Sequence, residues 1–192
     1  MVTVENRPLP SWARRQEIRV GAVIAVAVAI GLVVWLVAVR GGGSSKPKTT
    51  ASIPPTAASP DRLRSLSKDV GHPIYWIGPE TSTTYELTKT PSGRVYVRYL
   101  SGGAPVGTQN ASYTFVGTYP FPDAYAALKS LANKGTNKSF SAPGGGLAVY
   151  AKSTPTNVYL AYPGSSVQIE VYDPSPSHAR ELISSGRVAP VQ

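Results

Sequence analysis

The residues that most often perform chemistry are few and scattered in this sequence. It has two histidines and no cysteine. His72 precedes a proline and His178 falls in the first turn of a predicted helix, so their spacing makes no metal-binding pair. Ser65 and Lys68 have the serine–lysine spacing of penicillin-recognising enzymes, but the companion Ser-x-Asn and Lys-Thr-Gly motifs are absent. We therefore predict no catalytic residue, metal site or cofactor site, and interpret all four residues as surface positions.

Of two further patterns, the acidic residues leave an enzyme open as an alternative and the glycine run does not. The carboxylates Glu86, Asp123 and Glu170 could act together only if the fold brought a pair of them into one cleft. The glycine run at residues 144–146 precedes a predicted strand, so it lacks the helix N-terminus that phosphate cradles use and reads as a flexible loop. The alternative function is therefore a cell-envelope hydrolase or transferase whose site is assembled only in the fold.

Tyrosines and charges alternate with apolar residues along the predicted strands. All eleven tyrosines of the chain lie after residue 60. Strand alternation separates an apolar set, expected to meet the helices, from an outward set. The outward set is the candidate binding face and consists of Tyr96, Arg98, Tyr150, Lys152, Glu170 and Tyr172. Amphipathic rings beside polar groups suit glycan or protein binding. The simpler interpretation is that tyrosine fits a half-solvated pleated surface and cross-strand pairs stabilise it.

Capping residues and apolar periodicity predict the elements that would hold this face. Helices are expected to open at Asp61, at Asp123 and at Ser175 followed by a proline. Runs rich in Tyr, Val, Ile and Thr between them predict seven strands, with hairpin turns at "TPSGR" and "YPGSSV". We expect an α+β fold with an antiparallel sheet and helices on one face. The stretches starting at Ile74 and Leu147 resemble each other in length and turn placement, which favours a duplicated helix-plus-β-meander unit.

The N-terminal part has a different composition. The run from Val20 to Val39 carries no charge, and its 20 residues span about 30 Å as a helix, which is the thickness of a bilayer core. It is longer than the apolar core of a cleaved signal peptide, and Arg40 interrupts any cleavage site. We predict a basic cytoplasmic tail at 1–19, a transmembrane helix at 20–39 in contact with the lipid bilayer, a disordered Gly/Ser/Thr/Pro tether at 40–60, and an extracytoplasmic domain at 61–192.

The charge distribution argues against nucleic-acid binding. The formal net charge is +9, but seven of the nineteen basic residues lie in residues 1–60 against two acids. The basic residues after position 60 are scattered along the sequence, whereas a nucleic-acid interface needs them on one face. We therefore predict no nucleic-acid partner.

The basic N-terminus, the Val/Ala-rich run, the Thr/Pro/Ser segment and the Tyr-rich domain together resemble the uncharacterised single-pass membrane-anchored proteins of high-GC Gram-positive bacteria. The resemblance concerns architecture and implies no activity. It implies a cell-membrane location with the C-terminal domain outside. On this basis we expect an extracytoplasmic binding module whose partner is an envelope protein or glycan.

Overall fold

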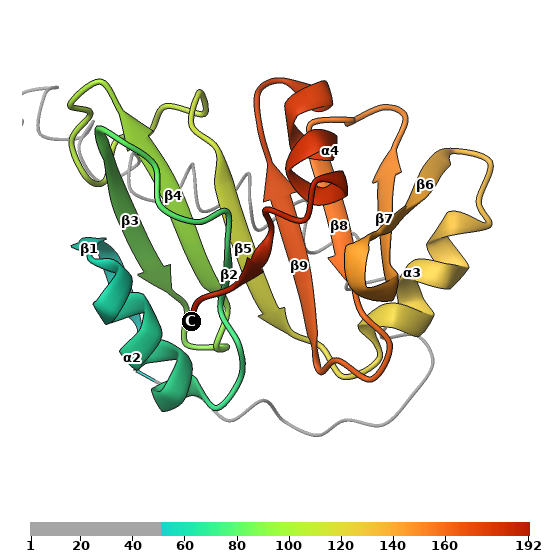
Figure 1. Cartoon of the computed structure of the whole chain (residues 1–192), viewed down its shortest axis with the longest axis horizontal. Coiled ribbons are helices and arrows are strands. Elements are labelled where there is room, and N and C mark those ends of the chain that lie inside the picture. The colour runs from blue at the N-terminus through green and yellow to red at the C-terminus, as the bar shows by residue number, and fades with distance from the viewer. Residues whose placement is uncertain (1–50) are drawn as a thin grey trace, which may run out of the picture. The chain divides into compact units, whose positions relative to one another are not determined.

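The computed structural model describes residues 51–192. They form an α+β domain in which three helices pack on one antiparallel sheet of eight strands, ordered β1-β3-β4-β5-β9-β8-β7-β6 (Figure 1). A second sheet pairs the two short strands β2 and β10. The helices are α2 (Pro60–Val70), α3 (Ala124–Ala132) and α4 (Pro176–Ser184), with a 3-10 turn, η2, at Pro143–Gly145. The strands are β1 (Ile53–Ala58), β2 (Tyr75–Trp76), β3 (Thr83–Lys89), β4 (Val95–Ser101), β5 (Phe115–Pro120), β6 (Asn137–Ala142), β7 (Gly146–Ala151), β8 (Asn157–Ala161), β9 (Val167–Tyr172) and β10 (Ala189–Pro190).

The predicted α+β fold class is confirmed, and so are the two hairpin turns. The turn between β3 and β4 contains Gly93 at φ 80°, and the turn between β8 and β9 contains Gly164 at φ 73°. These backbone angles favour glycine because a side chain would clash there.

The three helices do not share one face of the sheet. Leu63 and Leu66 of α2 and Leu182 and Ile183 of α4 belong to one core with Val97, Ile169 and Leu160. The buried residues of α3, Ala124 and Leu128, lie outside that core, as do Val149, Tyr159 and Ala161 on β7 and β8, which α3 contacts. Helix α3 therefore covers the opposite face at the β6–β8 end (Figure 1). The prediction of helices on one face is wrong for α3, because this part of the sheet is buried on both sides.

The predicted tether ends earlier than expected. Residues 53–58 form strand β1, which pairs with β3 and packs Ile53 and Ala58 against the core. The first helix begins at Pro60 with Ser59 as its N-cap, two residues before the predicted cap Asp61. The prolines at 54 and 55 suggest a disordered segment, but proline is tolerated on an edge strand because its missing N–H can face solvent. The domain therefore starts near Ile53 and not at residue 61.

The other N-terminal predictions lie outside the described residues. These are the cytoplasmic tail, the membrane span and most of the tether. Among residues 51–192, no helix has the length and apolar character needed to cross a bilayer.

Candidate functional site

The structure brings four of the six predicted face residues together and separates the other two. Tyr96 and Glu170 both pair with Gly117, and Arg98 and Tyr172 both pair with Phe115, so these four side chains share the face on which α3 packs. Tyr150 pairs with Lys138 on the opposite face, where the Arg180 guanidinium lies 5.3 Å from its ring centre.

Lys152 lies beyond the end of β7 and donates a hydrogen bond of 2.6 Å to the carbonyl of Gly135. The assignment of Tyr150 to the outward face is wrong, whereas Lys152 is exposed but lies beyond the end of the strand. Leu147 and Val149 lie on the α3 face, so the more apolar side of β7 is not the one that meets α2 and α4.

The guanidinium of Arg98 makes an ion pair and hydrogen bonds within the domain. It pairs with the buried carboxylate of Glu86 at 2.7 Å and donates to the carbonyls of Thr108 and Asn110 at 3.1 and 3.0 Å. Glu86 in turn accepts from the backbone N–H of Gly107 at 2.5 Å. These bonds fasten the β4–β5 loop over the sheet, so Arg98 serves as a structural clamp.

Glu170 is fully buried and cannot meet a partner. Its carboxylate accepts hydrogen bonds from the Tyr119 hydroxyl and, at 2.6 Å, from the Asn157 side chain. Burial raises the pKa of Glu170, and these hydrogen bonds oppose that rise by stabilising the ionised form. The Tyr159 hydroxyl is also enclosed beside this group, and it has no hydrogen-bond partner of normal geometry among the described residues. Burial and the nearby carboxylate raise the pKa of Tyr159.

The remaining rings of this face pack on one another. Phe115 stacks on Tyr172 with ring centres 5.2 Å apart, and Tyr96 lies 6.1 Å from Phe115 and 5.5 Å from Tyr119. Edge-to-face and stacked pairs of this kind stabilise a sheet surface. Several side chains of the predicted binding face therefore pack against one another or form hydrogen bonds within the domain.

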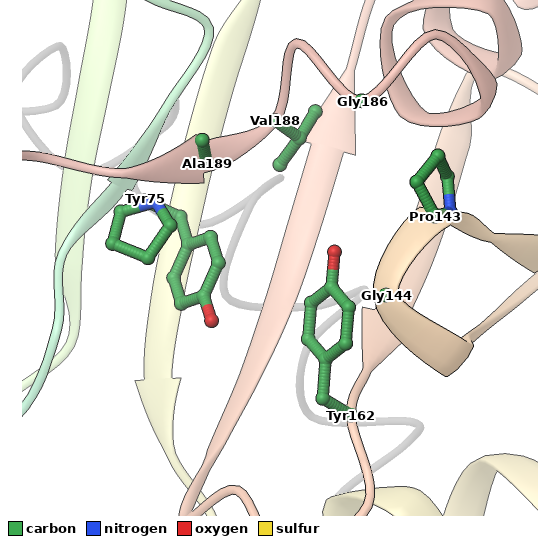
Figure 2. Close-up of a pocket in the computed structure, with 8 residues that line it drawn as sticks. Tyr75, Pro143, Gly144, Tyr162, Gly186, Val188 and Ala189 are labelled. Atoms are coloured by element: carbon green, nitrogen blue, oxygen red, sulfur yellow. The ribbon is translucent and has the colours of Figure 1, made fainter.

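A groove lies instead on the face that carries α2 and α4. It has a volume of about 370 Å³ and is lined by Tyr75, Pro143, Gly144, Tyr162, Gly186, Val188, Ala189 and Pro190 (Figure 2). Its walls come from β2, η2, the chain after β8 and the segment that leads from α4 into β10. The backbone N–H of Val191 donates to the carbonyl of Ile74 at 2.8 Å, which holds the C-terminal segment against β2.

Two tyrosine rings define this groove. The rings of Tyr75 and Tyr162 are nearly parallel, with an interplanar angle of 14° and ring centres 6.2 Å apart, and their hydroxyls point in opposite directions (Figure 2). The ring of Tyr162 lies against Gly146, where a Cβ atom would come within 2.8 Å of it. Within the described part of the chain neither hydroxyl makes a hydrogen bond. Burial raises the pKa of both tyrosines, so both hydroxyls stay protonated near neutral pH and can donate.

The residues that line the groove include no acid, histidine, lysine or serine. Glu86 and Glu170 share a face but lie three strand spacings apart, about 14 Å, which exceeds the separation of paired glycosidase carboxylates. Asp173 holds Nδ1 of His178 at 2.8 Å and accepts from Thr114 at 2.5 Å, and this contact fastens the start of α4 to β5. In residues 51–192 no three histidine or acidic side chains gather as metal ligands would.

The sequence signals for this groove were weak. The glycine run at 144–146 predicted a loop, but nothing in the pattern placed it next to Tyr75, about seventy residues earlier, or next to the C-terminal segment. Comparison of the chain with protein-family models, with curated proteins and with solved structures finds no match.

Proposed function

We propose that this protein is a non-enzymatic binding module of the cell envelope, and that the groove between Tyr75 and Tyr162 holds its ligand. The groove carries the proposal because it combines an apolar lining, two aromatic rings and two free hydroxyls at one open depression. Such a site suits a ligand with an apolar side and hydrogen-bonding groups at its edge, as a sugar ring of an envelope glycan has. An envelope protein segment is the competing ligand class.

The proposed location rests on the sequence. The charge-free run at residues 20–39 would anchor the chain in the cell membrane, with the N-terminus in the cytoplasm and the domain outside. The resemblance to single-pass proteins of high-GC Gram-positive bacteria supports the same placement. Protease added to intact spheroplasts is expected to digest the domain, while the cell-bound protein keeps Met1. A released form that begins near residue 41 would contradict the anchor.

We also propose that the domain arose by duplication of a helix-plus-meander unit. Strands β3, β4 and β5 form one meander and strands β7, β8 and β9 a second one, and the two meet at the antiparallel pair of β5 and β9. A helix precedes each half, and each outer edge carries one extra strand, but β1 comes before α2 in the chain whereas β6 follows α3. The helices lie on opposite faces, so any symmetry is carried by the strands alone.

A variant of Tyr162 tests the binding proposal. Tyr162→Ala removes one wall of the groove from a half-exposed position. An aromatic anchor supplies about 2 kcal/mol of binding, so capture of isolated cell-wall glycan by the full-length protein should fall about 30-fold. The matched control is Tyr125→Ala, which removes the same ring from the opposite face, on α3.

Two results would contradict the proposal in different ways. Unchanged glycan capture by a folded Tyr162→Ala variant would exclude the groove as the site. Loss of capture in Tyr96→Ser, with Tyr162→Ala unaffected, would return the site to the sheet face that the sequence predicted. Capture of envelope proteins in place of glycan, lost in the same Tyr162 variant, would keep the groove and change the ligand class.

A further inference from the structure

Four lysines lie on the elements around the edge strand β6, with Lys138 on the sheet face opposite to α3. Between Asp123 and Glu170 the sequence contains four lysines and no acid. The fold places all four near the edge strand β6: Lys129 in the last turn of α3, Lys134 in the turn that follows, Lys138 on β6, and Lys152 just after β7. All four are exposed. We call these four lysines the basic corner.

Backbone contacts hold the corner together. The N–H of Lys152 donates to the carbonyl of Thr136 at 3.0 Å, and its ammonium donates to Gly135 at 2.6 Å, so Lys152 lies against the turn that carries Lys134. Lys138 pairs with Tyr150 across β6 and β7, and the guanidinium of Arg180 lies over the same ring. A fifth positive charge therefore borders the corner from α4.

No acidic side chain neutralises these charges. The ion pairs among residues 51–192 join Asp61 to Arg64, Glu86 to Arg98, Asp173 to His178 and Glu80 to Arg187, and none involves the corner. Asp173 is buried, and its carboxylate is already taken by Thr114, Ser175 and His178. None of the four lysines of the corner therefore has an ion pair within residues 51–192.

One explanation within the fold accounts for part of this pattern. A lysine on an exposed edge strand discourages pairing with another sheet, and Lys138 on β6 fits that role. Lys129 and Lys134 are not on strand β6, so protection of this edge against pairing with another sheet does not explain them. A role in solubility would also not require acids to be absent from 46 consecutive residues, 124–169.

We propose that the basic corner binds the acidic phospholipid headgroups of the bilayer that anchors the chain. The ammonium groups are spread over a helix end, a turn and a strand, which suits a surface of many anionic groups better than one small anion. This inference rests on the membrane anchor of the proposed function. The chain between Val39 and Ile53 cannot carry the domain more than about 50 Å from the bilayer, so weak contacts act at high effective concentration.

The expected strength follows from the number of charges. Each lysine near an acidic membrane contributes roughly a fivefold increase in surface association, and salt screens this attraction. Removing two corner lysines should therefore lower the equilibrium constant for contact about 30-fold. The groove of Figure 2 is lined by none of these lysines, so its ligand binding should not change.

The test uses the full-length protein reconstituted in vesicles. The chain has no cysteine, so Ser139→Cys on β6 gives a single labelling site beside the corner, and Ser65→Cys on α2 gives a matched site away from it. A fluorophore at each site is read against lipids that carry a headgroup quencher. Vesicles of phosphatidylcholine alone are compared with an equimolar mixture of phosphatidylcholine and phosphatidylglycerol.

We expect quenching at position 139 only in the acidic vesicles, and its loss in about 1 M salt, where the screening length falls to about 3 Å. Lys134→Gln with Lys138→Gln should reduce the contact about 30-fold.

Three outcomes would overturn the proposal. They are equal quenching at both label positions, quenching that persists after the lysine substitutions, and preference for a soluble polyphosphate over the acidic bilayer. Failure of the membrane anchor can be told apart from failure of the corner proposal. Without a membrane anchor, alkaline carbonate would extract the chain from the vesicles. In that case flotation of the same full-length protein with acidic vesicles still reports whether the corner binds lipid.

Discussion

Replacing Gly117 with alanine is the sharpest test of the buried cluster around Glu170. Gly117 faces Glu170 across β5 and β9, and the ring of Tyr119 lies over it to reach the carboxylate. A Cβ atom at position 117 would collide with the Tyr119 hydroxyl and come within 2.7 and 2.9 Å of two ring carbons. Contacts under 3.0 Å do not persist, so the ring has to move away.

The cost follows from what Tyr119 loses. Glu170 keeps only the Asn157 bond, and a buried acceptor deprived of its donor costs about 1–3 kcal/mol. The displaced ring also loses its contact with Tyr96, worth about 0.5–1.5 kcal/mol. Alanine returns about 0.5–1 kcal/mol relative to glycine, because the unfolded chain loses less entropy on folding. The net change in the free energy of unfolding should be a loss of about 0.5–4 kcal/mol.

Urea denaturation followed by tryptophan fluorescence measures this change. Gly135→Ala is the matched control, since nothing lies within 4 Å of its added Cβ, and it should shift stability little. In a Tyr119→Leu background the colliding atoms are gone, so the added cost of Gly117→Ala should disappear, giving a coupling energy of about 1.5–4.5 kcal/mol. An equal cost in both backgrounds would show that the clash is not with Tyr119. A neutral single variant would refute the packing argument altogether.

Three further predictions concern the limits and the core of the domain. A polypeptide that begins at Ser59 lacks β1 and should be less stable by about 1–3 kcal/mol than one that begins at Ala51, because Ile53 loses its burial and β3 becomes an open edge; equal urea midpoints would contradict this. Leu128→Ala should cost about 2–5 kcal/mol, since the Leu128 side chain on α3 is fully buried; a cost within error would place that side chain in solvent. The pKa of Glu170 is raised in the folded state, so its contribution is complete below about pH 4.3 and is lost as pH rises through the raised pKa. Stability of Glu170→Gln relative to the wild type should therefore increase with pH above about 4.3, and a difference that stays constant with pH would contradict this.

The elements that sequence analysis identified have local signals. Ser175 caps α4 through its side chain, with Pro176 at the first helical position, and both features are visible in the sequence. Strands β4 and β9 alternate cleanly, so the residues that share each side were grouped correctly, but the side predicted to face outward is buried at Glu170. The strands that were missed are the edges. Strand β1 contains two prolines and β6 is polar and largely exposed, so neither carries the apolar alternation of a half-buried strand.

The candidate face was harder to predict for a different reason. Alternation tells which residues of a strand share a side, but not which element covers that side. On β7 both sides are covered, by α3 and by α4, so its alternation could not show which side faces the main core. The burial of Glu170 had no local signal either, since a glutamate between valine and isoleucine normally faces water.

A buried carboxylate at the centre of the sheet specifies register more than it adds stability. Burying the charge is costly, and an apolar residue in its place is often neutral or stabilising, so we infer that Glu170 selects one pairing of β5 with β9. A slip of one residue would turn the carboxylate into the apolar core. A slip of two would keep the face but set Glu170 opposite Phe115 or Tyr119, where no glycine leaves room for the Tyr119 ring. In the observed register the carboxylate is satisfied by Tyr119 and Asn157, and this pair is where the two meanders join.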